Sequence, residues 1–119
     1  MANPRRRRSE RVPCSIPVRW LRRSGVRELR AGDLNAHGMF LRCPEDVKLL
    51  PEELMLLEVV LPDRVLTAFG IARFIGKSVN GYGIGLELFV MEDRTRRAWL
   101  AYYRSLVAAH KAGALAAAG

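Results

Sequence analysis

The chain has 119 residues, the size of one modest domain, since domains typically run to ~100–200 residues. Half of its residues are apolar and 27% are charged, a globular balance that excludes wholesale disorder. The net charge of +8 belongs to residues 1–30, which hold ten arginines and two glutamates, whereas residues 31–119 hold ten cations and ten anions. A neutral body with a basic N-terminal arm does not favour a broad nucleic-acid-binding face.

Six segments are strand candidates, and the first, fourth and sixth of them have apolar residues at alternate positions, the pattern of strands with one buried face. They comprise residues 14–20, 26–34, 39–43, 54–61, 65–75 and 82–90. The last segment has the clearest alternation, with Ile84, Leu86 and Leu88 on one face and Gly83 and Gly85 on the other. Glycine on that second face allows another backbone or an aromatic ring to approach closely.

From Met91 onward the apolar period changes to that of a helix. The negative charges of Glu92 and Asp93 suit a helix N-terminus. One helical stripe is formed by Trp99, Tyr102, Tyr103, Leu106, Val107 and His110, which we expect to pack on the sheet. The residues from Ala112 on are rich in glycine and alanine and are expected to fray.

Six short strands followed by one helix predict a mainly β fold, a small six-stranded antiparallel barrel with one C-terminal α-helix. Side chains fill the interior of so small a barrel, so a ligand is expected to bind on the outside or at a rim.

The residues needed for catalysis are scarce. His37 lies in a turn, His110 is assigned to packing, and no Ser/His/Asp set, phosphate-binding loop or metal-ligand spacing is found. Cys14 and Cys43 occupy apolar strand positions, where a buried reduced thiol is expected. With a polar N-terminus and no run of ~20 apolar residues, we expect a cytoplasmic protein that is not an enzyme, binds no metal and does not insert into membranes.

Two short motifs carry the chemistry that remains. Arg7 and Arg11 form an Arg-x-x-x-Arg pattern directly before the first strand, and arginine can grip a phosphate or a guanine edge through its planar fork. Asp33, Asn35 and Gly38 form an Asp-x-Asn-x-x-Gly turn between two strands. The carboxylate and amide could meet the N1–H and N2–H₂ edge of guanine, and Gly38 would allow a conformation that a side chain hinders.

These motifs, their order before a barrel pattern with Tyr82-Gly83-Ile84-Gly85, and the terminal helix resemble a PilZ domain over about residues 6–106. The resemblance implies a bacterial receptor for the second messenger cyclic di-GMP. It also implies a six-stranded barrel fold and a role in motility or biofilm formation. It implies ligand-binding roles for Arg7, Arg11, Asp33 and Gly38, with Asn35 at a position where the family has Ser.

Three further residues are candidates for the site, and Asn35 departs from the family pattern. An arginine at position 6 resembles the pattern of family members that bind a stacked pair of nucleotides, and Arg8 is a candidate accessory residue. His37 is a second accessory candidate, which could crowd the pocket or stack on a base. Asn35 has a side chain one heavy atom longer than Ser, so a tight turn would lower the affinity for the ligand.

We therefore expect residues 1–11 to be a flexible arm with the first motif, residues 12–110 to be the barrel and helix, and residues 111–119 to be a disordered tail. The leading hypothesis is a single-domain cyclic di-GMP effector that signals to an unidentified protein partner through a changed surface. The alternative is a nucleotide-independent adaptor for motility, secretion or envelope machinery. An RNA- or DNA-binding module is disfavoured, and homodimerisation and the number of nucleotides bound per chain stay open.

Overall fold

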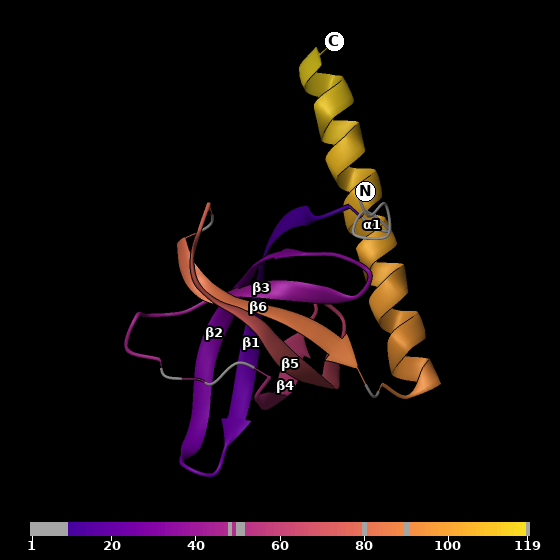
Figure 1. The fold of residues 1–119 in the computed structure, drawn as a ribbon. Coiled ribbons are helices and arrows are strands. Elements are labelled where there is room, and N and C mark those ends of the chain that lie inside the picture. Colours follow the sequence, from indigo (N-terminus) through magenta and orange to yellow (C-terminus); the bar gives the residue numbers. More distant parts are fainter. Residues whose placement is uncertain (1–9, 48, 50–51, 80, 90, 119) are drawn as a thin grey trace, which may run out of the picture.

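The computed structural model describes residues 10–47, 49, 52–79, 81–89 and 91–118, with side chains up to residue 113. Six strands are followed by one helix (Figure 1). The elements are β1 (Val12–Arg22), β2 (Gly25–Leu34), β3 (Gly38–Arg42), β4 (Leu54–Val60), β5 (Val65–Ser78), β6 (Gly81–Phe89) and α1 (Asp93–Ala118). This order confirms the predicted mainly β fold with one C-terminal helix.

All six strands pair in antiparallel fashion and form a closed barrel in the order β1-β2-β3-β6-β5-β4. Pairing of β1 with β4 closes the barrel, so neither strand is left as an unpaired edge. The sequential pairs β1–β2, β2–β3, β4–β5 and β5–β6 are antiparallel neighbours, and β3 crosses to pair with β6. The motif turn between β2 and β3 consequently lies beside β6.

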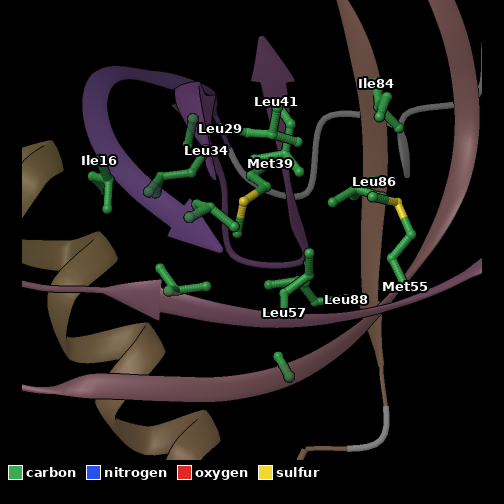
Figure 2. Packing of buried hydrophobic residues seen from close by; sticks show 14 of the residues in the cluster. Ile16, Leu29, Leu34, Met39, Leu41, Met55, Leu57, Ile84, Leu86 and Leu88 are labelled. Carbon is green, nitrogen blue, oxygen red and sulfur yellow. The ribbon is translucent and has the colours of Figure 1, made fainter. Parts of the chain in front are cut away.

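The barrel interior is filled by the apolar side chains that alternate along the strands. Side chains from different strands meet there, among them Leu34, Met39, Leu57 and Ile84, each fully buried (Figure 2). Burying an aliphatic side chain of this size contributes ~1.5–3 kcal/mol, so this core supplies a large part of the driving force for folding. A filled interior leaves the outer surface for ligands, as the sequence predicted.

Helix α1 lies beside the barrel and its C-terminal part projects beyond the strands (Figure 1). Trp99 and Tyr103 are buried against the barrel, and Leu106 and Val107 are half-buried. No helix among the described residues is long and apolar enough to cross a membrane.

One expectation for the C-terminal part of helix α1 is wrong. His110 is exposed rather than packed, because all of residues 108–113 are exposed where the helix projects past the barrel. Helix α1 itself runs to Ala118. Alanine has the highest intrinsic helix propensity, which allows the helix to continue without a packed face.

Three β-bulges interrupt the regular pairing. They lie between Pro13 and Ile16 of β1, at Gly32 of β2, and at Arg73 of β5. An extra residue in one strand reverses the face to which the following side chains point. Bulges therefore decide which side chains reach the outer surface near the motif turn.

The glycines of β6 allow close approach, as expected from the sequence. A Cβ atom at Gly83 would lie 2.1 Å from the carbonyl oxygen of Leu41 and 2.7 Å from the Phe40 ring. Any larger side chain at Gly83 would push β3 away from β6.

Candidate functional site

The two sequence motifs meet through an ion pair. The Arg11 Nη1 atom donates to Asp33 Oδ1 at 2.6 Å, although the two residues are 22 positions apart in the chain. The Arg11 side chain is 56% exposed, whereas that of Asp33 is only 12% exposed. Asp33 is thus a largely buried carboxylate whose negative charge is balanced by an exposed guanidinium. Arg6, Arg7 and Arg8 lie outside the described residues.

The bulge at Gly32 gives Asp33 its orientation. Leu29 and Ala31 are buried in the barrel core, and regular alternation would send the next odd residue, Asp33, into the same core. The extra residue instead returns Leu34 to the core and turns Asp33 to the outer face, where Arg11 meets it. A one-residue irregularity thereby avoids burying an unpaired carboxylate among apolar side chains.

The turn that follows Asp33 is fixed by its own hydrogen bonds. The Asn35 Oδ1 atom accepts a hydrogen bond from the backbone N–H of His37 at 2.9 Å, and the Asn35 N–H donates to the Gly38 carbonyl at 2.9 Å. The His37 carbonyl accepts from the N–H of Leu88 at 2.8 Å, which ties the turn to β6. The side-chain Oδ1 atom of Asn35 therefore shapes the turn, while the Nδ2 group of the same side chain is the donor that a ligand could use.

Gly38 is required for a different reason from the one expected. Its backbone is outside the left-handed region, since the glycines with positive φ are Gly25, Gly76 and Gly81 among the residues described. A Cβ atom at Gly38 would instead lie 2.0 Å from the carbonyl oxygen of Leu86. The glycine allows the start of β3 to approach β6 closely.

A pocket of about 240 Å³ opens on the outside of the barrel beside this turn. One part of its lining comes from the motifs, through Arg11, Asn35, His37 and Gly38. The other part comes from β5 and β6 and consists of Arg73, Phe74, Gly85, Leu86 and Glu87. Asp33 is joined to the pocket through its ion pair with Arg11.

Arg73, Phe74 and Glu87 line the pocket but were not predicted from the sequence to be site residues. Arg73 Nε donates to Glu87 Oε1 at 2.9 Å, and Arg73 Nη1 donates to Glu52 Oε2 at 2.6 Å. The hydrogen bonds to Glu87 and then to Glu52 raise the pKa of Arg73 further above its ordinary value. No local pattern in the sequence marks these residues, because their position at the pocket depends on the pairing of β5 with β6.

Helix α1 supports both motifs through hydrogen bonds, one set to the motif turn and one to the residue before Arg11. Trp99, which is 1% exposed, donates its indole Nε1–H to the carbonyl oxygens of Asn35 and Ala36, each at 3.2 Å. The Tyr103 hydroxyl donates to the carbonyl oxygen of Glu10, directly before Arg11, at 2.6 Å. The helix stripe predicted from the sequence thus supports the turn and the start of β1 as well as the core.

Cys14 lies close to the site, and its environment disfavours the thiolate form. Its Sγ atom lies 3.6 Å from the Ala31 carbonyl oxygen, to which it donates. Burial, and secondarily the negative charge of Asp33, raises the pKa of Cys14 from 9.0 to about 11, with Arg42 acting in the opposite direction. Burial likewise raises the pKa of Cys43, and both cysteines are free.

We expect slow alkylation of Cys14. At pH 8 its thiolate population should be about 100-fold below that of a thiol with the ordinary pKa, because each pH unit is a factor of ten. Iodoacetamide labelling of a Cys43→Ser variant followed by mass spectrometry should show a rate that rises about tenfold per pH unit up to about pH 10. A rate that levels off by pH 9 would contradict the raised pKa.

The site has no grouping of metal ligands within the part of the chain that the structure describes. The described site consists of guanidinium groups, an amide, an imidazole, an exposed ring and carboxylates. Arginine and amide donors beside an aromatic ring are suited to an organic ligand that carries anionic groups.

A small closed antiparallel barrel with one C-terminal helix, and with an arginine-lined pocket on its outer surface, is the class of domain that the fold and the site define. The chain belongs to the PilZ domain family, whose model matches residues 5–105 and spans both motifs. The resemblance seen in the sequence is therefore confirmed.

Three solved structures share the fold at low sequence identity. The inhibitor of motility MotI/DgrA of Bacillus subtilis is 17% identical with a TM-score of 0.72, and the match covers 84% of this chain but 50% of that chain. The PilZ domain of YcgR from Escherichia coli, solved with c-di-GMP, is 15% identical with a TM-score of 0.70, covering 92% and 97%. The PilZ domain of CeSA from a cellulose-synthesizing bacterium is 20% identical with a TM-score of 0.63, covering 82% and 97%.

The chain spans half the length of MotI/DgrA. No curated protein sequence matches the chain.

Proposed function

We propose that this domain is a receptor for cyclic di-GMP, a binding domain rather than an enzyme. The observation that carries the proposal is the Arg11–Asp33 ion pair, which brings the two family motifs to one pocket. The likeness in fold to the PilZ domain of YcgR, solved with c-di-GMP, supports the same class of ligand.

The chemistry of Arg11 suits a phosphate. A guanidinium has five N–H donors, so Arg11 can keep Nη1 on Asp33 and direct other donors to a phosphate oxygen. Arg7 and Arg6 are assigned to the ligand by the family resemblance, with Arg8 as an accessory. A ligand that carries two negative charges would then be bound by several arginines through charge-assisted hydrogen bonds.

The turn from Asp33 to Gly38 is the proposed guanine-reading element. The Asp33 carboxylate accepts hydrogen bonds, and the Nδ2 group of Asn35 donates, which matches the donor and acceptor edges of guanine. His37 lies on the pocket wall, where its ring could contact a base. We assign the signal to a change in the surface around this pocket, read by a protein partner.

The proposal predicts selectivity for guanine. In competition experiments with a fluorescent cyclic di-GMP probe, unlabelled cyclic di-GMP should displace the probe, whereas cyclic di-AMP should not, because adenine has no N1–H or N2–H₂ donors for Asp33. Equal displacement by the two nucleotides would contradict the assigned role of the turn.

An adaptor that acts without nucleotide is the second candidate, and the outer face of β4 and β5 favours it. Leu54, Val65 and Phe69 share that face and are 57%, 47% and 39% exposed. Apolar side chains gathered on one face are typical of protein-binding surfaces. Absence of binding to any cyclic dinucleotide, together with capture of a specific protein that Phe69→Ser abolishes, would favour the adaptor.

The Asn35→Ser variant should bind cyclic di-GMP more tightly. Serine can still accept the His37 N–H through its Oγ atom, its O–H can donate to the base in place of the Asn35 Nδ2 group, and the shorter side chain leaves more room for that base. We expect a gain of about 3- to 10-fold in affinity, which corresponds to ~1 kcal/mol, a typical hydrogen-bond contribution.

Calorimetric titration of Asn35→Ser and of an Asn35→Ala control measures this gain. The alanine variant lacks an acceptor for the His37 N–H and should bind more weakly than either of the others. Weaker binding by Asn35→Ser than by the natural sequence would show that the amide is the better partner for the ligand.

A further inference from the structure

The pocket has a second wall that neither motif provides, and a β-bulge builds it. Along β5 the residues Leu66, Ala68 and Ala72 point into the barrel and are buried. Regular alternation would place Phe74 in the core as well. The bulge at Arg73 reverses the alternation, so Phe74 is 47% exposed and Ile75 packs against the core in its place.

As a result, two consecutive residues of one strand line the same pocket. Arg73 and Phe74 both face the space that Arg11 and the motif turn line from the other elements. Bulges beside binding sites commonly re-aim a side chain in this way. The bulge exposes Phe74 and so loses the stabilisation that burying an aromatic ring would give. The exposed ring is therefore better suited to binding than to core packing.

The glycines of the neighbouring positions shape the space around the Phe74 ring. Phe74 pairs with Gly85 on β6, and a Cβ atom at Gly85 would lie 3.4 Å from the Cβ atom of Phe74. A Cβ atom at Gly76 would lie 3.4 Å from the tip of the ring. With no side chains at these two positions, part of the ring stays open to a planar partner.

The Arg73 guanidinium is held by exchangeable partners. Glu87 and Glu52 bind it at 2.9 and 2.6 Å, and the side chains of Arg73, Glu87 and Glu52 are 45%, 51% and 71% exposed. Ion pairs between exposed side chains are weak, so an anion in the pocket can compete with either carboxylate for the same donors. A phosphate suits this exchange because the arginine fork can bind two of its oxygens at once.

We propose that Arg73 and Phe74 form a second recognition wall, in which Arg73 binds a phosphate in exchange for Glu87 and Phe74 stacks on a guanine. This inference rests on the proposed function. Cyclic di-GMP has two guanines and two phosphates, so the motif turn and Arg11 can bind one set while the β5 wall binds the other. Stacking on an exposed ring beside a cation is a common mode of nucleobase binding.

Calorimetric titration with cyclic di-GMP tests the wall with two variants. Arg73→Ala should weaken binding about 10-fold or more, through loss of charge-assisted hydrogen bonds. Phe74→Leu keeps an apolar side chain without the ring and should weaken binding about 5- to 100-fold, the usual range for one base stack. Arg64→Ala is the matched control, since Arg64 is 54% exposed and paired with Asp63 outside this pocket.

Glu87→Gln supplies an independent readout in the opposite direction. Removing this competing carboxylate should tighten binding about 2- to 5-fold. The gain is small because an exposed ion pair contributes little energy, and the ligand no longer has to displace that ion pair. Arg73→Lys keeps the charge without the fork and should fall between the natural sequence and Arg73→Ala. Thermal unfolding of each variant shows that it is folded.

The outcomes separate the two proposals. If the natural sequence binds and both Arg73→Ala and Phe74→Leu bind within twofold of it, the β5 wall is refuted and the receptor function stands. If the natural sequence does not bind cyclic di-GMP at all, the proposed function fails, and the wall fails with it as a site for this ligand.

Discussion

Replacing Arg11 with alanine is expected to reduce the affinity for cyclic di-GMP by about 100-fold or more, enough to abolish detectable binding at micromolar protein concentrations. The variant loses the charge-assisted hydrogen bonds to the ligand. It also loses the Arg11–Asp33 ion pair, at a carboxylate that is only 12% exposed. Removing one positive charge from the pocket also weakens its attraction for a ligand that carries two negative charges. Calorimetric titration measures the effect directly.

Controls for Arg11→Ala must separate binding from folding. Because the Arg11 side chain is 56% exposed, its ion pair contributes on the order of 1 kcal/mol to stability, and the variant should unfold cooperatively. Arg64→Ala removes an arginine of similar exposure, 54%, from the turn before β5 and should bind as the natural sequence does. Unchanged affinity in a folded Arg11→Ala variant would refute the assignment of Arg11 to the ligand.

Replacing Trp99 with alanine is expected to lower the free energy of unfolding by about 3–5 kcal/mol, the usual cost of truncating a buried tryptophan. The indole is 1% exposed, and its N–H binds two carbonyl oxygens of the motif turn. Loss of the ring leaves a cavity between α1 and the barrel and removes the donor that holds the turn. Urea unfolding followed by circular dichroism measures the change.

Milder variants distinguish packing from support of the site. Trp99→Phe keeps most of the ring but lacks the indole N–H, so it should weaken cyclic di-GMP binding as well as stability. Trp20→Phe is the matched control, because Trp20 is also buried, at 6% exposure, but lies in the core on β1. Equal effects of the two variants on ligand affinity would show that Trp99 has a packing role alone. A loss of stability below about 1 kcal/mol in Trp99→Ala would contradict its assigned role in packing.

The regular parts of the fold follow from side-chain periodicity. Alternation together with turn residues predicted six strands, and the change of period at Met91 predicted the helix, because one-sided burial imposes a period on an element. The bulges could not be predicted in this way. In the stretch Arg73-Phe74-Ile75, either Phe74 or Ile75 can fill the same core position, and only pairing with Gly85 of β6 decides between them.

The candidate site was predictable where local chemistry is concentrated in a motif. Arg11 and Asp33 were singled out from the sequence, and the structure brings them within 2.6 Å of each other. Arg73 and Glu87 were missed, because their position at the pocket depends on pairing between β5 and β6 rather than on a local pattern. Gly38 was selected for its conformational freedom, whereas the approach of the Leu86 carbonyl is what excludes a side chain.

The length of the packed stripe on the C-terminal helix could not be predicted from helical spacing. The stripe that includes Trp99 was extended to His110 by helical spacing alone, but spacing does not reveal where the barrel beneath the helix ends. Beyond Val107 the helix has no barrel wall to cover, and His110 is exposed for that reason.

Calorimetric titration of the natural chain with cyclic di-GMP tests the central claim most directly, because it reports affinity and the number of nucleotides bound per chain together. The account predicts saturable binding with a dissociation constant in the micromolar range or below, and either one nucleotide or a stacked pair per chain. A titration of folded protein that shows no saturable binding would contradict the assignment of this domain as a cyclic di-GMP receptor.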